Sequence, residues 1–210
     1  MATYAPVSDP RYFYLKDFQS KRLRDTYGDL AEQKAYKSAC FFFFNRLYST
    51  EDTADRDASF RKIYANVKRF LGGEIVASMA KLIELAELTD RLDMTLLGVL
   101  EKEGAPVEFD METYERAYRL SDNYDDRILQ IELLVFTNRL IHKISHRFGI
   151  GMGLRALRTA CLVTGDTRMV DFLMDGYRAF ADLRRIEPLV DAIDQRERER
   201  LDRIYGISAK

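Results

Sequence analysis

Residues 39–48 read ACFFFFNRLY, and the four consecutive phenylalanines in this stretch, Phe41–Phe44, decide the interpretation of the fold. Successive residues of an α-helix are rotated by about 100°, so the four rings point in four directions around the helix axis. A helix that is apolar on nearly every side is buried on nearly every side. The stretch therefore predicts the central helix of a helical bundle, which we expect to extend from about residue 31 to residue 48.

The same helix allows a second interpretation, in which Phe41 and Phe42 line a cavity for an apolar ligand or form a subunit interface. Arg46 projects close to this apolar face. A buried guanidinium needs a carboxylate partner, because an unpaired charge in the interior is very costly. The candidate partners of Arg46 are Asp55, Asp57, Glu84 and Glu87.

Helical periodicity extends over almost the whole chain, and only 4 prolines and 11 glycines interrupt its 210 residues. Pro10 in a first helical turn and Asp110 before an apolar-periodic segment are typical start signals. Eight or nine helices with short connections predict an all-α fold, a single globular bundle over residues 1–210. Besides residues 31–48, we expect helices at about 9–27, 55–72, 74–103, 110–120, 124–147, 154–163, 169–180 and 188–206.

The composition excludes several classes of partner. Lys and Arg total 33 against 34 Asp and Glu, and a formal charge of −1 offers no general attraction for nucleic acid or an anionic membrane. The longest apolar run is shorter than the roughly 20 residues that span a bilayer. Cys40 and Cys161 form no CxxC pattern, and residues 1–18 lack the features of a signal peptide. We therefore expect a cytoplasmic protein.

The segment FFFNRLY (42–48), followed by the polar STEDTADRD (49–57), resembles the signature of an uncharacterised bacterial family named for its FFLEELY motif. The similarity covers the whole chain and includes IELAELTDRLD (83–93) and DFLMDGYRAFADL (171–183). The Glu-Glu pair of that motif falls on Asn45 and Arg46, so the local charge is reversed. The resemblance implies a helical bacterial protein and carries no particular activity.

The two histidines, His142 and His146, lie four residues apart, which places both on one face of a helix. With carboxylates such as Glu84 or Glu132, such a pair can bind zinc or iron. However, the same face carries cations, including Lys143, that would repel a metal ion. The alternative is a polar or capping role near the helix end, and no cofactor is predicted.

The apolar stripe of the histidine helix lies opposite this face, so the sequence predicts that the stripe is buried and the histidine face solvated. The stripe consists of Leu129, Leu133, Phe136, Leu140 and Ile144.

Residues 149–153 read GIGMG, which resembles a phosphate-cradling loop but follows a helix where such loops follow a strand. The segment therefore predicts a tight turn between two closely packed helices. Arg147, Arg155 and Arg158 surround the turn, where an anion or an acidic partner could dock. Cations are also common at a helix C-terminus for purely structural reasons.

Four carboxylates, Glu84, Glu87, Asp90 and Asp93, step by three along the helix expected at 74–103. Paired carboxylates can hold a metal or perform acid–base chemistry, but they need a cleft and perturbed pKa values. A solvated, ion-paired face is the simpler expectation.

No nucleophile set of known type can be assembled from the sequence. We therefore expect a non-catalytic protein that acts by binding a protein partner or by forming a homodimer. Two alternatives remain: a helical-bundle metalloenzyme that uses His142 and His146, and a carrier of an apolar ligand lined by the Phe41–Phe44 helix.

Overall fold

The computed structural model describes residues 9–43, 73–164 and 167–207. Within these ranges all regular secondary structure is helical, which confirms the predicted all-α fold. The described helices are α1 (Pro10–Thr26), α2 (Gly28–Ala31), α3 (Lys37–Phe42), α5 (Gly73–Lys102), α6 (Met111–Leu120), α7 (Tyr124–Ser145), α8 (Ile150–Thr164), α9 (Arg168–Ala181) and α10 (Glu187–Tyr205).

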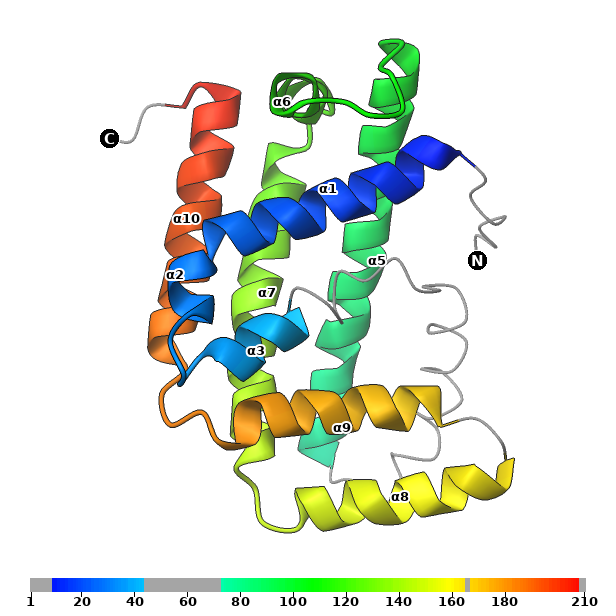
Figure 1. Ribbon diagram of the computed structural model, residues 1–210, viewed down its shortest axis with the longest axis vertical. Helices are drawn as coiled ribbons and strands as arrows, with labels where there is room; N and C mark the ends of the chain where they lie inside the picture. The colour runs from blue at the N-terminus through cyan, green and yellow to red at the C-terminus, as the bar shows by residue number, and fades with distance from the viewer. Residues whose placement is uncertain (1–8, 44–72, 165–166, 208–210) are drawn as a thin grey trace.

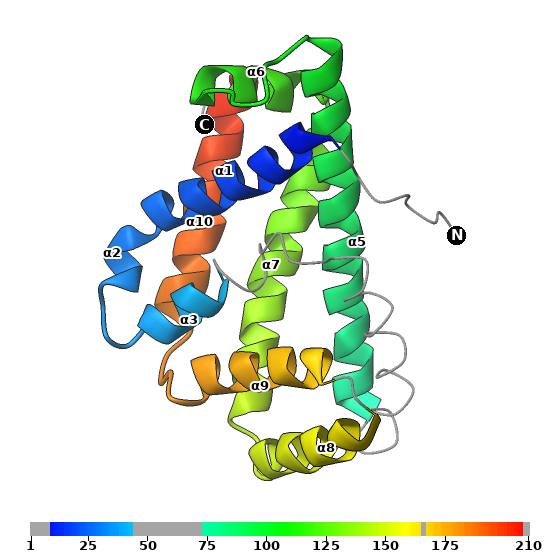
Figure 2. The ribbon, with the colours of Figure 1, turned by 45° about the vertical axis from the view of Figure 1, so that its right-hand side comes forward.

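Three long helices, α5, α7 and α10, run side by side and form the frame of the molecule (Figure 1). Helices α1 and α9 cross this frame on one side, α6 lies at one end, and α8 lies at the other (Figure 2). Helix α7 packs against α10, α5 and α9, so it is the central helix of the bundle.

Local sequence signals account for several helix boundaries. The carboxylate of Asp9 accepts a hydrogen bond from the backbone N–H of Arg11 at 2.9 Å, and Pro10 occupies the first position of α1. Asp110 caps α6 in the same way, because its side chain accepts from Thr113 N–H at 2.9 Å. Helix α10 ends at Gly206, whose φ of 68° is the left-handed conformation that glycine adopts at low cost.

The predicted helix from residue 31 to 48 is wrong in its first part. The chain turns after α2, and α3 begins only at Lys37. Residues 32–35 are all exposed, so no apolar contact holds a helix across this polar segment. The described part of α3 packs on α9 and α2, whereas α7 packs on α9 and on both other long helices, so α3 is not the central helix. The helix expected at 55–72 lies outside the described residues.

The aromatic run divides between core and surface. Phe42 and Phe43 are buried, whereas Phe41 is 64% exposed. Phe42 packs on Phe172 and Phe180 of α9, with ring centroids 5.3 and 6.2 Å away. A Cβ atom at Gly176 would lie 3.0 Å from the Phe42 ring, so this glycine permits the close approach of α3 to α9. Phe44 lies outside the described residues.

Candidate functional site: a buried polar pocket

The central helix α7 buries polar side chains as well as part of its predicted apolar stripe. Leu133 of the stripe is buried, but Leu129 and Phe136 are exposed, and Arg127, Gln130 and Asn138 on other faces are buried. The prediction of a single buried face is wrong because α5, α9 and α10 surround α7, so more than one face of the helix is covered. The sequence does contain a signal for the buried polar face, because Arg127, Gln130 and Asn138 recur at helical spacing within an otherwise apolar helix.

The polar side chains of α7 lie between two apolar clusters of the interior. On α1, Leu15 belongs to one cluster and Leu23 to the other. On α5, Leu96 and Leu92 are divided in the same way, with Asp93 between them. The helices therefore carry their polar residues into a layer that separates the two clusters.

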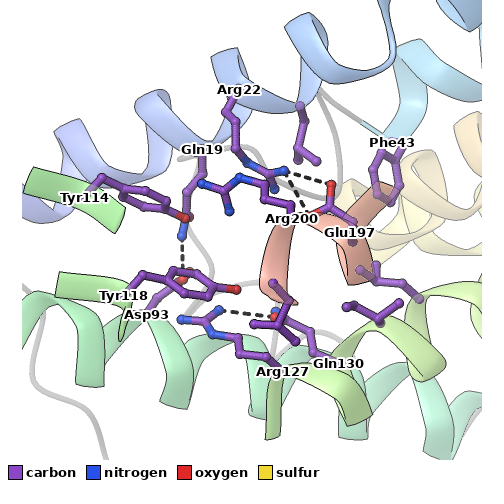
Figure 3. A pocket seen from close by; sticks show the side chains of 14 residues that line it. Gln19, Arg22, Phe43, Asp93, Tyr114, Tyr118, Arg127, Gln130, Glu197 and Arg200 are labelled. Carbon is purple, nitrogen blue, oxygen red and sulfur yellow. Dashed lines mark hydrogen bonds and ion pairs between the residues drawn. The ribbon is translucent and has the colours of Figure 1, made fainter. Parts of the chain in front are cut away.

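This layer contains a pocket of about 30 Å³ among α1, α5, α6, α7 and α10 (Figure 3). A space of that size holds about two water-sized groups. The pocket is lined by Gln19, Arg22, Leu23, Phe43, Asp93, Tyr114, Tyr118, Arg127, Gln130, Ile131, Leu134, Glu197, Arg200 and Leu201.

Arg22 and Glu197 form one fixed wall of the pocket. One guanidinium nitrogen of Arg22 donates to both carboxylate oxygens of Glu197, at 2.8 and 2.9 Å. The Tyr27 hydroxyl donates to the same carboxylate at 2.9 Å. Burial alone would raise the pKa of Glu197, but the charge and hydrogen bonds of Arg22 lower the pKa below its usual value. The carboxylate of Glu197 is therefore ionised and fully engaged.

Gln19 and Asp93 form a second wall, and Lys16 supports it from outside the pocket. Lys16 makes a buried ion pair with Asp93, which is 1% exposed, and Gln19 donates to the other oxygen of Asp93 at 2.9 Å. The expected solvated face is therefore wrong at Asp93. Burial would lower the pKa of Lys16, but Asp93 raises it above the ordinary value.

Arg127 differs from the other buried cations because no carboxylate lies within ion-pair distance of it in the described part of the chain. Its side chain is 3% exposed, and it donates to Gln130 at 3.2 Å and to the carbonyl of Leu92 at 3.4 Å. Its Nε–H has no acceptor among the described residues. Since an uncompensated buried charge is strongly unfavourable, this arrangement calls for an anion.

Tyr118 joins Arg127 to a third arginine. The guanidinium of Arg127 lies 4.2 Å from the Tyr118 ring centroid, and that of Arg200 lies 5.7 Å from it. Burial raises the pKa of Tyr118 to about 12, so the phenol stays protonated and can donate a hydrogen bond at neutral pH. Figure 3 shows this phenol directed into the space between the two arginines.

The pocket therefore offers more donors than acceptors. Three arginines line it against two carboxylates, and both carboxylates already accept hydrogen bonds from neighbours. Within residues 9–43, 73–164 and 167–207, the Nε–H groups of Arg22 and Arg127 lack acceptors, and Gln19 Oε1 lacks a donor. Guanidinium groups arranged in this way match an oxyanion, and the amide oxygen matches a hydroxyl or a protonated group on the same ligand.

The predicted metal ligands lie outside this pocket; the rings of His142 and His146 lie 4.4 Å apart, but the predicted carboxylates pair with cations instead. His142 Nε2 lies 2.7 Å from the carbonyl oxygen of Leu183, and His146 Nδ1 lies 2.9 Å from that of His142. Glu132 pairs with Arg198 at 3.3 Å, and Glu84 pairs with Lys81 at 2.6 Å. No group of three or more His, Cys, Asp or Glu among the described residues is arranged to hold a metal ion.

The glycine-rich segment is a turn only at Gly149, because α8 begins at Ile150 and includes the other two glycines. A Cβ atom at Gly151 would lie 2.7 Å from the Tyr177 hydroxyl, so the close packing is between α8 and α9 and not between the two helices that the turn joins.

Of the arginines around this turn, Arg158 donates to Asp171 at 2.6 Å. Arg147 and Arg155 are exposed. Arg46 lies outside the described residues, as do the candidate partners Asp55 and Asp57.

Comparison with known proteins places the chain in a family without an assigned role. A family model described as "Domain of unknown function (DUF8198)" matches residues 3–210, so the chain belongs to that family. No curated protein and no solved structure matches the chain. Among the described helices, none combines the length and the apolar character that crossing a membrane requires.

Proposed function

We propose that this protein is a non-catalytic binding protein whose polar pocket takes two oxygen atoms of a small oxyanion, a carboxylate or phosphate group. The observation that carries the proposal is the burial of Arg127 without a carboxylate partner among the described residues. An oxyanion beside Arg127 would accept a hydrogen bond from the Nε–H, which has no acceptor in the described part of the chain, and it would compensate the positive charge of the guanidinium. Arg200 and the Tyr118 phenol would donate to the same group.

The direction of the pKa shifts supports binding over acid–base chemistry. General acids and bases work best with pKa values near the operating pH. In and around the pocket the resolved shifts lead away from neutrality: the pKa of Glu197 is lowered, that of Lys16 is raised, and that of Tyr118 reaches about 12. Burial also raises the pKa of the Cys40 thiol to about 11, which makes that cysteine a poor nucleophile.

Calorimetric titration tests the proposal. The full chain is dialysed into Tris chloride buffer of low ionic strength, which contains no oxyanion, and titrated with acetate and with inorganic phosphate. Arg127→Met removes the charge at similar volume, and Arg127→Lys retains the charge but loses the planar fork. Arg139→Met is the matched control, because Arg139 lies on the same helix and makes an exposed 3.7 Å pair with Asp191.

We expect wild type and Arg139→Met to bind at least one of the two anions equally well. Arg127→Met should not bind, and Arg127→Lys should bind more weakly than wild type. Absence of binding to wild type, or equal binding to wild type and Arg127→Met, would contradict the proposal.

A second function, contact with a protein partner or a second copy of the chain, is favoured by the surface around α8. Phe148, in the turn before α8, is 98% exposed, and Met152 and Leu162 are exposed on neighbouring sides of α8. Arg155 lies between them on this surface. Monomeric proteins rarely expose contiguous apolar patches of large area, so such a surface suits an interface.

Sedimentation velocity over a hundredfold range of concentration tests the self-association form of this function. We expect wild type to dimerise and Phe148→Ser to remain a monomer, with Leu120→Ser on the distant helix α6 as the exposed apolar control. A monomeric wild type over the whole range would rule out the homodimer. Our proposal also retains a bacterial, cytoplasmic setting, supported by two cysteines that form no disulfide.

A further inference from the structure

A second hollow adjoins the polar pocket on the outside of the molecule. It is an open groove of about 660 Å³ between α1, α6 and α10. Its volume lies within the range of small-molecule binding sites, whereas the inner pocket is far smaller. The groove is lined by Arg22, Asp25, Thr26, Met111, Glu115, Arg196, Glu199, Arg200 and Arg203.

Two side chains, Arg22 and Arg200, line both the groove and the inner pocket. They therefore form the partition between the two spaces. Any ligand that reaches Arg127 from the groove has to pass or displace one of these two arginines.

Arg22 is the fixed part of the partition. Its guanidinium makes two short hydrogen bonds with Glu197, and the paired side chains are 12% and 13% exposed. Burial would lower the pKa of Arg22, but Glu197 raises it above the ordinary value, so the pair stays ionised and engaged. Moving this arginine would leave a buried carboxylate without its partner, which is costly.

Arg200 is held far less firmly. Its contact with Glu115 is 3.4 Å long, whereas Arg203 donates to the two oxygens of the same carboxylate at 2.9 Å each. Its side chain is 12% exposed, and its other contacts among the described residues are the Met111 sulfur at 3.8 Å, aromatic rings more than 5 Å from its guanidinium, and a longer-range attraction to Glu197. The Arg200 side chain can therefore leave the partition without breaking a short ion pair.

The charges of the groove restrict the chemistry of a ligand. Arg196 donates to both oxygens of Asp29 at 2.7 Å, and Arg203 is engaged in the same way by Glu115. These cations are already compensated, so the groove offers hydrogen-bonding groups more than net positive charge. It suits an uncharged polar body, while Arg127 in the inner pocket suits an acidic group.

We propose that the groove and the pocket are the two halves of one site, entered past Arg200, whose ligand is an organic acid. Its single carboxylate or phosphate group reaches Arg127, and its uncharged polar body, such as a polyhydroxylated chain, lies in the groove. This inference rests on the proposed oxyanion function and adds the ligand class and the entrance.

Paired probes with and without a polar body test this inference on the full chain. Acetate is compared with gluconate, and inorganic phosphate with glycerol 3-phosphate, by calorimetric titration. Met111→Trp fills the groove from α6, and Asp25→Trp fills it from α1; both positions are exposed, so the folded state tolerates the larger ring. Leu129→Trp on the exposed face of α7 is the control for a surface tryptophan.

We expect wild type and Leu129→Trp to bind one organic probe at least tenfold more tightly than the corresponding small anion. Both groove-filling variants should abolish this difference and leave the affinity for acetate or phosphate unchanged. Equal affinity of each pair of probes for wild type, or full retention of tight binding in both filled variants, would overturn the inference while the small-anion function stands. Failure of every probe to bind wild type would instead overturn the oxyanion function and, with it, this inference.

The entrance is tested separately by the rate of association. Glu115→Gln weakens the hold on Arg200, so stopped-flow mixing should show association of the organic probe several-fold faster than in wild type. Glu132→Gln, which loosens an exposed contact with Arg198 on the far side of α10, is the control. Unchanged association in Glu115→Gln would contradict entry past Arg200.

Discussion

The guanidinium of Arg127 lies 4.2 Å from the ring centroid of Tyr118, in a part of the interior where no described carboxylate reaches it. An aromatic face attracts a cation more strongly when water is excluded. The Tyr118 ring therefore supplies part of the stabilisation that a counter-ion would otherwise provide.

Removal of this ring should destabilise the fold. We expect Tyr118→Leu to lower the free energy of unfolding by about 1–3 kcal/mol, through lost cation–π attraction and lost packing. Tyr118→Phe keeps the ring and should cost less than about 1.5 kcal/mol. Urea denaturation followed by circular dichroism measures both values. Equal losses in the two variants would show that the ring itself contributes nothing to holding Arg127.

The buried pair of Lys16 and Asp93 should respond in a different way. Asp93→Ala leaves the lysine charge buried and should cost about 3–5 kcal/mol, whereas the double variant Lys16→Met/Asp93→Leu should recover most of this loss. Glu84→Gln on the same helix breaks only an exposed contact with Lys81 and should change stability by less than about 0.5 kcal/mol. If the double variant were as unstable as Asp93→Ala, the loss in Asp93→Ala would not come from the unpaired charge of Lys16, and this explanation would be wrong.

Glu197 should make stability depend on pH under acidic conditions. The folded state holds the pKa of Glu197 below its usual value of 4.5, so its carboxylate contributes full stability above pH 4.5. That contribution is lost as the pH falls below 4.5 and through the folded-state pKa. Thermal melts between pH 7 and pH 3 should therefore show a steeper decline for wild type than for Glu197→Gln. Parallel declines would show that this pair has no part in acid unfolding.

The close approach of α3 to α9 depends on Gly176. We expect Gly176→Ala to cost about 1–3 kcal/mol, because the new Cβ lies 3.0 Å from the Phe42 ring and the packed ring has to move. Gly98→Ala within α5 meets no atom within 4 Å, and its higher helix propensity should stabilise the protein by about 0.5–1 kcal/mol. The effect is measured as the difference in melting temperature between Gly176→Ala and Gly98→Ala. Equal melting temperatures of the two variants would contradict the packing of α3 on α9.

The sequence predicted the parts of this structure that depend on neighbouring residues. Asp9, Pro10 and Asp110 mark helix starts because capping groups act within three residues. The pocket was not predicted, since its pairs join distant segments: Lys16 meets Asp93 across 77 positions, and Arg22 meets Glu197 across 175. No local pattern distinguishes these carboxylates from others on the same helices.

The central helix was also misassigned for a physical reason. Four successive phenylalanines indicate burial, and Phe42 and Phe43 are indeed buried, but a helix of one or two turns at the edge of a bundle can bury two rings. Helix α7 occupies the centre although its sequence is more polar, because its buried polar side chains form hydrogen bonds inside the fold. Arg127 donates to Gln130 of the same helix, and Gln130 donates to Thr89 of α5.

The central claim, that an oxyanion compensates Arg127, is tested most directly by the stability of wild type relative to Arg127→Met with and without the anion. A ligand at a hundred times its Kd adds about 2.7 kcal/mol to the stability of the state that binds it. In Tris chloride buffer without any oxyanion, Arg127→Met should melt at the same temperature as wild type or higher, since it removes an uncompensated buried charge. With saturating acetate or phosphate the order should reverse, with wild type more stable by several degrees. A difference between the two proteins that stays constant at every anion concentration would contradict the account.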